Sequence, residues 1–492
     1  MAFAHHPFFR PLWRVAAASC VLALSACADV GPARALRVAT GFASRHICSD
    51  TLLSGMRPEA ARAERVSTQG AMRWVDPWMS VTVDSDQHEV RATLAGAFSQ
   101  RARFTPGYGC RLLDADEPAP MPAPLLAESP APWLDEIAGP QVVHATSPAL
   151  AAAIALAFDE PDGPGMHQTK AVLVLHDGRV IAERYAPGSG PDTPWLGFSM
   201  SKSLTNALLG VLVQQGKLTL DQEALLPAWP GWPGWPGSPA DVRSAITVEQ
   251  LLRQTSGLDL VQDNSGFDAN SRMLFIERDQ AAFAAARPLA RPPGQQWHYT
   301  DGHFILLARL LRNATTHAVG ADAAAAVRAF AHRHLFAPLG MQQLTMEFDA
   351  TGTPQGASFF FGSARDWARL GELFRLDGML AGHRLLPAGW VAMSTRPTLA
   401  TGYGAGWWTN THGGDIYPVW GVPWGFANAP RDAYFARGFM GQFTLVIPSE
   451  RLVIVRLGIS HRPGDDISFV DRMVGAIRAA LALPDSMPAT GH

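Results

Sequence analysis

Two hairpins are the clearest structures that the hydrophobic pattern predicts, and they lie far apart in the chain. Apolar, β-branched runs at Ala171–Leu175 and Val180–Glu183 flank an Asp-Gly turn, which is a strong hairpin signal. A similar pair, Phe443–Ile447 and Leu452–Leu457, flanks a turn that begins with proline. Strands at both ends of a long region are typical of a single antiparallel sheet.

Helical spacing dominates the segments around these hairpins. After Ser199, leucine and valine recur at three- and four-residue intervals as far as Leu212, and Gly216 is placed to cap the end. The other helix-like segments are Leu150–Phe158, Phe304–Leu311 and Ile467–Leu483. The pattern predicts an α+β fold, in which terminal helices flank an antiparallel sheet that carries a helical subdomain.

The beginning of the chain has a different pattern. Residues 28–113 contain short strand-like runs, Met79–Val83 and Glu89–Leu94, and predict a small β-rich N-terminal unit. Residues 114–132 contain six prolines among alanines, a composition typical of an extended linker. The main domain is expected at residues 133–492.

The first 27 residues predict an export signal rather than part of the fold. Arg10 and Arg14 precede an apolar run, Val15–Ala26, that is too short for a lasting membrane anchor. The run ends in Leu-Ser-Ala-Cys27, which resembles the lipobox of bacterial lipoproteins, where the cysteine is lipidated. This resemblance implies a periplasmic protein of the bacterial cell envelope, anchored to a membrane by a lipid at Cys27. Plain secretion with cleavage after Ala28, or a retained membrane helix, are the alternatives.

Composition narrows the possible classes of protein. Hydrophobic residues make up 47% of the chain and charged residues 17%, which indicates a globular protein rather than a disordered one. The net charge is −3 and no basic stripe occurs, so a nucleic-acid partner is not expected. No cysteine or histidine spacing typical of a metal site occurs, and neither a metal nor an organic cofactor is expected.

Four cysteines occur, and two of them, Cys20 and Cys27, belong to the export segment. Export places the other two, Cys48 and Cys110, in an oxidising compartment, where we expect a disulfide between them. Two buried free thiols are the alternative.

Only three of the 40 basic residues are lysines, and one of these follows a serine in Ser199-Met200-Ser201-Lys202. Arginine stays protonated, whereas a buried lysine can change its protonation state. A Ser-x-x-Lys sequence is a known way to activate a serine as a nucleophile. At the start of a helix the two side chains share a face, and unpaired N–H groups there favour a developing oxyanion. The alternative is that Ser199 caps the helix and Lys202 is solvated.

Two later segments resemble known catalytic motifs that follow a Ser-x-x-Lys sequence along the chain. Tyr299-Thr300-Asp301 precedes an apolar helix and is similar to a Y-x-N motif, while Ala436-Arg437-Gly438 precedes the last hairpin and is similar to a K-T-G motif. With Ser199 and Lys202, this order resembles the serine β-lactamase and penicillin-recognising superfamily. The likeness is closest to its class C-like branch, which includes esterases, D-amino-acid peptidases and 6-aminohexanoate-dimer hydrolases. It extends from about Gln168 to Ser460.

The resemblance implies roles for the matching residues. Ser199 would be the acylated nucleophile, with Lys202 and Tyr299 as the pair that handles its proton. The backbone N–H groups of Ser199 and Phe439 would form the oxyanion hole. Three further residues are expected to contribute to substrate binding: Asp301, Arg437 and Gly438.

Two positions depart from the family's pattern. Asp301 replaces an asparagine, and a carboxylate beside Lys202 would favour the charged lysine. Either Asp301 points away, or Lys202 acts as a cation while Tyr299 carries the proton, and we favour the second. Ala436 replaces a cation that helps to hold a substrate carboxylate. The neighbouring Arg437 would face the opposite side of the strand, where an ion pair is the alternative to substrate binding.

These residues predict an exported serine hydrolase that cleaves small ester or amide bonds through a covalent acyl-enzyme on Ser199. A β-lactamase or a D,D-carboxypeptidase is the alternative enzyme. A catalytically inactive, ligand-binding member of the same fold is the alternative from another class. The expected partners are a small-molecule ester or amide substrate and a membrane contacted through the lipid anchor.

Overall fold

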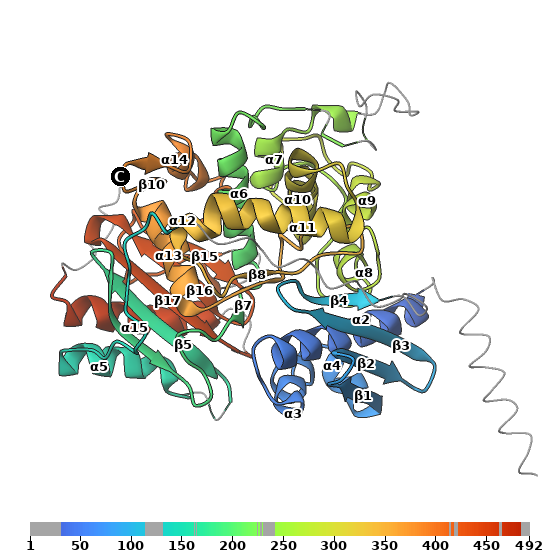
Figure 1. The fold of residues 1–492 in the computed structure, drawn as a ribbon, viewed down its shortest axis with the longest axis horizontal. Coiled ribbons are helices and arrows are strands. Elements are labelled where there is room, and N and C mark those ends of the chain that lie inside the picture. Colours follow the sequence, from blue (N-terminus) through green and yellow to red (C-terminus); the bar gives the residue numbers. More distant parts are fainter. Residues whose placement is uncertain are drawn as a thin grey trace, which may run out of the picture.

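The structure of the chain, shown in Figure 1, is a computed structural model. It describes residues 31–113, 131–226, 242–412, 415–417, 422–461 and 465–483, with Trp229, and without Asp162, Pro164 and Ala224. The predicted export segment with Cys27 lies outside the described residues, as does most of the predicted linker 114–132. Within the described ranges, no helix has both the length and the apolar composition needed to cross a membrane.

A six-stranded antiparallel sheet forms the centre of the main domain, residues 131–483 (Figure 1). In sheet order its strands are β12 (Trp408–Thr409), β15 (Tyr434–Gly438), β16 (Gln442–Ile447), β17 (Leu452–Gly458), β5 (Thr169–His176) and β6 (Arg179–Tyr185). Both predicted hairpins are present, and they meet where β17 pairs with β5. Asp177 and Gly178 have φ angles of 50° and 77°, as the tight turn between β5 and β6 requires.

Helices cover both faces of this sheet. On one face lie α6 (Met200–Gln214) and α13 (Ala364–Arg375), and on the other lie α5 (Pro148–Ala155) and α15 (Asp465–Ala480). Val453 and Val455 of β17 contribute to the core on the first face, and Ile454 between them contributes to the core on the second. This two-sided burial explains why β16 and β17 are hydrophobic throughout instead of alternating.

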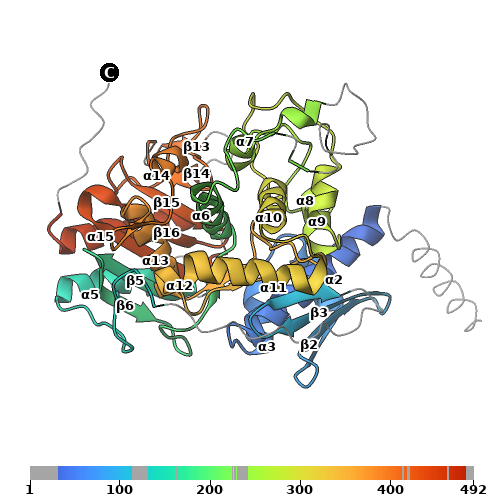
Figure 2. The same cartoon turned by 45° about the horizontal axis from the view of Figure 1, so that its top comes forward.

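A helical subdomain packs on the other side of α6 (Figure 2). Its helices are α7 (Val248–Leu252), α8 (Ala269–Phe275), α9 (Gln280–Ala285), α10 (Asp301–Thr315), α11 (Gly320–Ala331) and α12 (Ala337–Leu339). Helix α10 is central, because it contacts α6, α7, α9 and α11. The remaining elements of the main domain are α14 (Trp390–Ser394) and the short strands β7 (Trp195–Leu196), β8 (Thr345–Met346), β9 (Phe360–Gly362), β10 (Met379–Leu380), β11 (His383–Arg384), β13 (Ile416–Tyr417) and β14 (Val422–Pro423).

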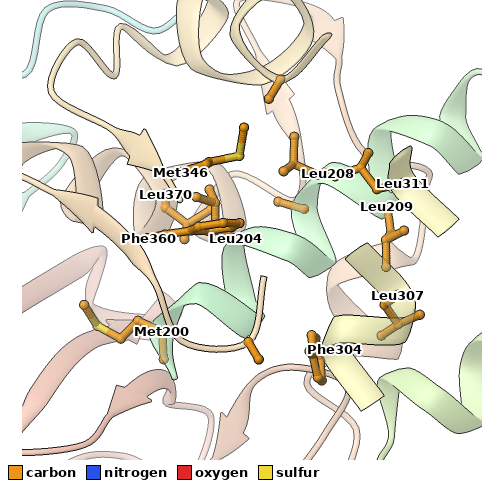
Figure 3. Packing of buried hydrophobic residues seen from close by; sticks show 14 of the residues in the cluster. Met200, Leu204, Leu208, Leu209, Phe304, Leu307, Leu311, Met346, Phe360 and Leu370 are labelled. Carbon is orange, nitrogen blue, oxygen red and sulfur yellow. The ribbon is translucent and has the colours of Figure 1, made fainter. Parts of the chain in front are cut away.

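Helix α6 is held rigidly between the sheet and the helical subdomain. All of its residues from Met200 to Leu212 are buried. Figure 3 shows Leu204 in the same packed cluster as Leu307 and Leu311 of α10. The helix ends as predicted, with Gly216 at a φ of 67° just beyond its last turn. Packing on all sides of the helix fixes the position of its first turn.

The N-terminal unit, residues 31–113, contains more than the predicted strands. A four-stranded antiparallel meander is formed by β1 (Met79–Asp84), β2 (Glu89–Leu94), β3 (Phe98–Thr105) and β4 (Gly109–Leu113). A helix of 22 residues, α2 (Gly31–Leu52), packs across it, and the sequence pattern did not predict this helix. The short helices α3 (Pro58–Ala61) and α4 (Met72–Val75) and a π-helical turn (Arg62–Val66) follow α2.

A disulfide joins Cys48 of α2 to Cys110 of β4, with 6.1 Å between the two Cα atoms. This is the pairing that the sequence favoured over two free thiols. Both cysteines are completely buried in the small core between α2 and the meander. The bond therefore fastens the helix to the sheet of the N-terminal unit.

The N-terminal unit is docked on the main domain through one buried carboxylate, that of Glu347. Arg45 of α2 donates to it from Nη2 at 2.8 Å, and Ser49 donates from its hydroxyl at 2.6 Å. The backbone N–H of Cys110 donates to the same carboxylate at 2.8 Å. Burial raises the pKa of Glu347, while the charge of Arg45 opposes this. The carboxylate is thus stable only while the N-terminal unit surrounds it.

Replacing Glu347 with alanine should lower the free energy of unfolding by about 3–5 kcal/mol, because the Arg45 guanidinium would remain buried without its counter-charge. Urea titration followed by circular dichroism measures this change. The matched control is Asp259→Ala, which removes an ion pair with Arg287 whose two side chains are 41% and 32% exposed, and which should cost no more than about 1 kcal/mol. Equal effects of the two substitutions would contradict the docking role of Glu347.

Candidate active site

Ser199 lies in a tight turn that leads from β7 into α6. The turn is closed by backbone hydrogen bonds from Met200 to the carbonyl of Gly197, at 3.1 Å, and from Ser201 to that of Phe198, at 2.9 Å. Phe198 has a φ of 46°, a region that bulky side chains seldom occupy. The side chain of Ser199 makes no capping hydrogen bond to α6. Its hydroxyl is therefore not used as a helix cap, which was the structural alternative for this residue.

Lys202 is directed at Ser199 and is 1% exposed. Its ammonium group donates to Ser199 Oγ at 3.0 Å, to Asp301 Oδ1 at 2.5 Å and to the carbonyl of Ala357 at 3.0 Å. These three acceptors match the three hydrogens of a charged lysine. The alternative of a solvated Lys202 is wrong.

The surroundings of Lys202 favour its charged form. Burial lowers the pKa of its ammonium group, but the nearby Asp301 and Tyr299 raise it, and the pKa ends above its ordinary value. A lysine in this state remains a cation at neutral pH and cannot accept a proton there. This agrees with the hypothesis that Lys202 acts as a cation.

Asp301 points toward Lys202, so the alternative that it points away is wrong. Its carboxylate is also bonded at Oδ2 by the Ser358 hydroxyl at 3.0 Å and by the Asn270 amide at 3.3 Å. The residue is 3% exposed, and all its acceptor positions face these partners. The expectation that Asp301 binds substrate is therefore corrected: its carboxylate is enclosed as the counter-ion of Lys202.

Tyr299 completes the cluster just before α10. The Lys202 Nζ lies 4.9 Å from the centroid of its ring. The ring packs edge-on against Tyr403, with centroids 5.8 Å apart, and beside Trp408 at 5.9 Å. Tyr403 in turn accepts a hydrogen bond from the Gln254 amide at 3.1 Å. The aromatic neighbours fix the orientation of the Tyr299 ring toward Lys202.

Four polar residues support the cluster without having been singled out from the sequence: Gln254, Gln262, Asn270 and Ser358. The Gln254 side chain accepts from the Thr300 N–H at 2.6 Å, and that of Gln262 accepts from the Asp301 N–H at 2.7 Å. Both bonds hold the backbone at the start of α10. No local pattern marks these side chains, since their partners are distant in the sequence.

Gly438, at the end of β15, allows this strand to approach the turn before Ser199. A Cβ atom added at Gly438 would lie 2.1 Å from the carbonyl oxygen of Gly197, which is a steric clash. Glycine avoids this clash because it has no Cβ atom. The next residue, Phe439, packs its ring edge-on against Phe198 with 5.5 Å between centroids. Within the described residues, neither the N–H of Ser199 nor that of Phe439 donates a backbone hydrogen bond. Both donors thus remain available on neighbouring segments.

Arg437 does not join this cluster, and its expected role in substrate binding is corrected. Its guanidinium donates to Asp466 of α15 at 3.1 Å. The neighbouring Ala436 packs in the core on the α6 face, whereas Phe435 packs in the core on the α15 face. Since alternate residues of a strand face opposite sides, Arg437 lies on the α15 face. Across the described ranges, no group of three His, Cys, Asp or Glu side chains is arranged to hold a metal ion.

An antiparallel sheet with a helical subdomain, and a Ser-x-x-Lys sequence at the start of a buried helix, are the features of the β-lactamase-like serine hydrolases. Residues 157–467 match the family described as Beta-lactamase, and this is more than half of the chain. The chain therefore belongs to the beta-lactamase family. The matched residues begin after the N-terminal unit.

Three known proteins are similar to the chain. A 6-aminohexanoate-dimer hydrolase from Paenarthrobacter ureafaciens is 26% identical over 235 residues, which are 45% of this chain and 56% of that protein. The chain thus spans little more than half the length of this relative. A solved Bacillus anthracis structure, provisionally named a 6-aminohexanoate-dimer hydrolase, has a TM-score of 0.50 at 20% identity over 65% of this chain and 81% of that chain. A class C β-lactamase structure from Rhodobacter sphaeroides has a TM-score of 0.46 at 18% identity over 68% of this chain and 100% of that chain.

Replacing Asp301 with asparagine should move the alkaline limb of the reaction at Ser199 to lower pH by at least about one unit. The wild-type pKa of Lys202 is raised, so its cation persists to high pH. Without the Asp301 carboxylate, burial, which lowers the pKa of the lysine, is opposed by Tyr299 but no longer by Asp301. The rate of labelling by a fluorophosphonate probe, measured against pH, reports this limb. Asp259→Asn, at a surface carboxylate of the same subdomain paired with Arg287, should leave both limbs in place. An unchanged profile in folded Asp301→Asn would exclude an electrostatic role for Asp301.

Proposed function

We propose that this protein is a serine hydrolase that cleaves small ester or amide bonds through an acyl-enzyme on Ser199. The observation that carries the proposal is the buried contact of Lys202 with both Ser199 Oγ, at 3.0 Å, and Asp301 Oδ1, at 2.5 Å. A buried ion pair of this kind is costly to form, and here one partner is hydrogen-bonded to the candidate nucleophile. The positive φ of Phe198, next to Ser199, is further support, since such strain often lies at active sites.

In the proposed mechanism, Tyr299 accepts the proton and Lys202 remains a cation throughout. The Lys202 ammonium donates to Ser199 Oγ, so the serine's own hydrogen is directed elsewhere. Tyr299, whose ring lies beside the Lys202 ammonium, acts as a phenolate and takes that hydrogen as Ser199 Oγ attacks the substrate carbonyl. The backbone N–H groups of Ser199 and Phe439 would stabilise the oxyanion that forms.

The same groups then complete the formation of the acyl-enzyme and its hydrolysis. The tetrahedral intermediate collapses, the bond to the alcohol or amine breaks, and this leaving group takes the proton from Tyr299. An acyl-enzyme on Ser199 remains. A water molecule then gives its proton to Tyr299 and attacks the acyl carbon, releasing a carboxylic acid and restoring the Ser199 hydroxyl with the proton from Tyr299.

The proposed substrates have a leaving group without a carboxylate. The cation that would hold a substrate carboxylate is absent, because Ala436 occupies its place and Arg437 is paired with Asp466 on the opposite face. A substrate carboxylate that entered the site would lose its hydrogen bonds to water without gaining a cationic partner. This favours neutral esters and amides over the β-lactams and D,D-peptides of the alternative enzymes. The 26% identical relative named a 6-aminohexanoate-dimer hydrolase supports an amide as one substrate type.

The alternative of an inactive, ligand-binding protein accounts less well for the site. A binding protein has no need for a serine that is bonded to a buried lysine rather than to the helix it precedes. Nor does it need free N–H groups on two neighbouring segments.

We also propose that the chain is exported and held at a bacterial envelope membrane through lipid at Cys27. The support is the lipobox-like Leu-Ser-Ala-Cys27 sequence and the disulfide between Cys48 and Cys110, which requires an oxidising compartment.

Growth of bacteria expressing the full chain with radiolabelled palmitate should label the protein, and Cys27→Ser should abolish the label. Lipid attachment needs the cysteine thiol, whereas plain secretion does not. Cys20→Ser is the matched control, because it lies in the same segment and should keep the label. A labelled Cys27→Ser protein, or an unlabelled wild type, would refute lipidation at this residue.

The wild-type protein should hydrolyse a neutral phenyl ester at least about tenfold more efficiently, in kcat/KM, than the same ester with a carboxylate on its phenyl leaving group. Ser199→Ala should lower kcat for both by at least about a thousandfold, because the nucleophile is removed. Lys202→Arg should also abolish activity, since the larger guanidinium cannot occupy the buried lysine site. Efficient hydrolysis of carboxylate-bearing esters or β-lactams would instead support the alternative enzymes.

A further inference from the structure

The N-terminal unit reaches the main domain at the two segments that carry the proposed oxyanion hole. Arg65, in the π-helical turn, is 1% exposed. Its Nη1 donates to the sulfur of Met440 at 3.4 Å, and its guanidinium carbon lies 5.2 Å from the centroid of the Phe198 ring. Phe198 directly precedes Ser199, and Met440 directly follows Phe439. One side chain thus contacts the neighbours of both N–H donors.

Both contacted residues have a backbone conformation that needs external support. Phe198 has a φ of 46° and Met440 a φ of 63°, although neither is glycine. Such conformations persist only where the surrounding structure fixes them. Phe198 shares a peptide group with Ser199 and so sets the direction of the Ser199 N–H. Met440 follows Phe439 in the turn after β15 and holds the segment that carries the Phe439 N–H.

Arg65 is itself held in one orientation by Asp50 of α2. Its Nε donates to Asp50 Oδ2 at 2.8 Å and its Nη2 to Oδ1 at 3.3 Å. Both side chains are at most 2% exposed. The planar guanidinium therefore binds the Asp50 carboxylate through Nε and Nη2 and directs Nη1 at Met440. A lysine, with a single nitrogen, could not make both contacts in this geometry.

Other residues of the N-terminal unit act on the same two segments. The Gln69 amide approaches the Met440 sulfur at 3.8 Å, and the ring of His46 lies 5.8 Å from that of Phe198. Lys170 of β5 forms an ion pair with Glu64, next to Arg65, at 2.7 Å. The unit is thus fastened to the sheet beside the contact that Arg65 makes.

We propose that Arg65 is a positioning residue of the active site, which aligns the N–H groups of Ser199 and Phe439 through its contacts with Phe198 and Met440. The proposal rests on the proposed function, because it assigns the two N–H groups to an oxyanion hole. Residues 31–113 lie outside the 157–467 match to the beta-lactamase family, so this support is an addition to the domain that the family shares.

The test replaces the buried pair with apolar side chains, in Asp50→Leu/Arg65→Met, so that no charge is left unpaired in the core. With a neutral phenyl ester, kcat should fall at least about tenfold while KM stays within about twofold, because an oxyanion hole acts on the transition state. The inhibition constant of phenylboronic acid, which forms a tetrahedral adduct with serine, should rise in proportion to the loss of kcat/KM. Arg65→Lys keeps the positive charge but lacks the planar guanidinium. It should therefore lower kcat by a smaller factor, again with KM nearly unchanged.

The matched control is Arg62→Met/Asp76→Asn, which removes an ion pair that lies within the N-terminal unit and has an Nε–Oδ1 distance of 2.9 Å. This variant should keep wild-type kcat and boronate affinity. Thermal unfolding and near-ultraviolet circular dichroism confirm that each variant is folded under assay conditions.

Wild-type kcat and boronate affinity in folded Asp50→Leu/Arg65→Met would overturn the role of Arg65 and leave the proposed function intact. An equal loss in the Arg62 control, or a loss in KM alone, would also overturn it, since either would indicate general loosening of the unit. A wild type that neither hydrolyses esters nor binds the boronate would instead refute the proposed function, and the role of Arg65 with it.

Discussion

The buried ion pair between Lys202 and Asp301 is the interaction on which the rest of this structure depends. Two opposite charges in a core are stable only if each remaining hydrogen-bonding group is satisfied. Here the ammonium uses Ser199 and the carbonyl of Ala357, and the carboxylate uses Ser358 and Asn270. The pair joins α6 to α10, and its partners come from the turn before α6, from α8 and from the loop before β9, so the pair determines how the sheet side and the helical subdomain meet.

This pair also determines which residue can move a proton. A lysine with three acceptors and a raised pKa is committed to its charged form. The asparagine that the family has in place of Asp301 would not impose this. In the proposed mechanism, the exchange of one amide for a carboxylate leaves proton transfer to Tyr299, whose ring is fixed by Tyr403 and Trp408. The proposed substrate preference rests separately on Ala436, which places no cation at its position of β15.

Local signals in the sequence predicted most of the main domain. The Asp-Gly turn and the leucine spacing after Ser199 specify structure over a few residues, and both hairpins and α6 form where expected. Helix α2 was missed because its buried face contains Ser44, Arg45, His46, Ser49 and Asp50, which hide the apolar period.

The site itself could be predicted only in part. The Ser-x-x-Lys spacing placed Lys202 beside Ser199 because both belong to one helical turn. The direction of Asp301 and the supporting Gln254 and Ser358 could not be derived, since each depends on a partner between 46 and 149 residues away along the chain.

The carboxylate of Glu347 has a consequence for the order in which the protein folds. Cys48 and Cys110 are 62 residues apart, so the disulfide can close as soon as the first quarter of the chain is available. Arg45 must wait for a partner 302 residues further on. Contacts of such large sequence separation form slowly, because a long loop has to close first. The oxidised N-terminal unit therefore carries an unmatched arginine until the segment around Glu347 has folded, and its docking on the main domain is a late step of folding.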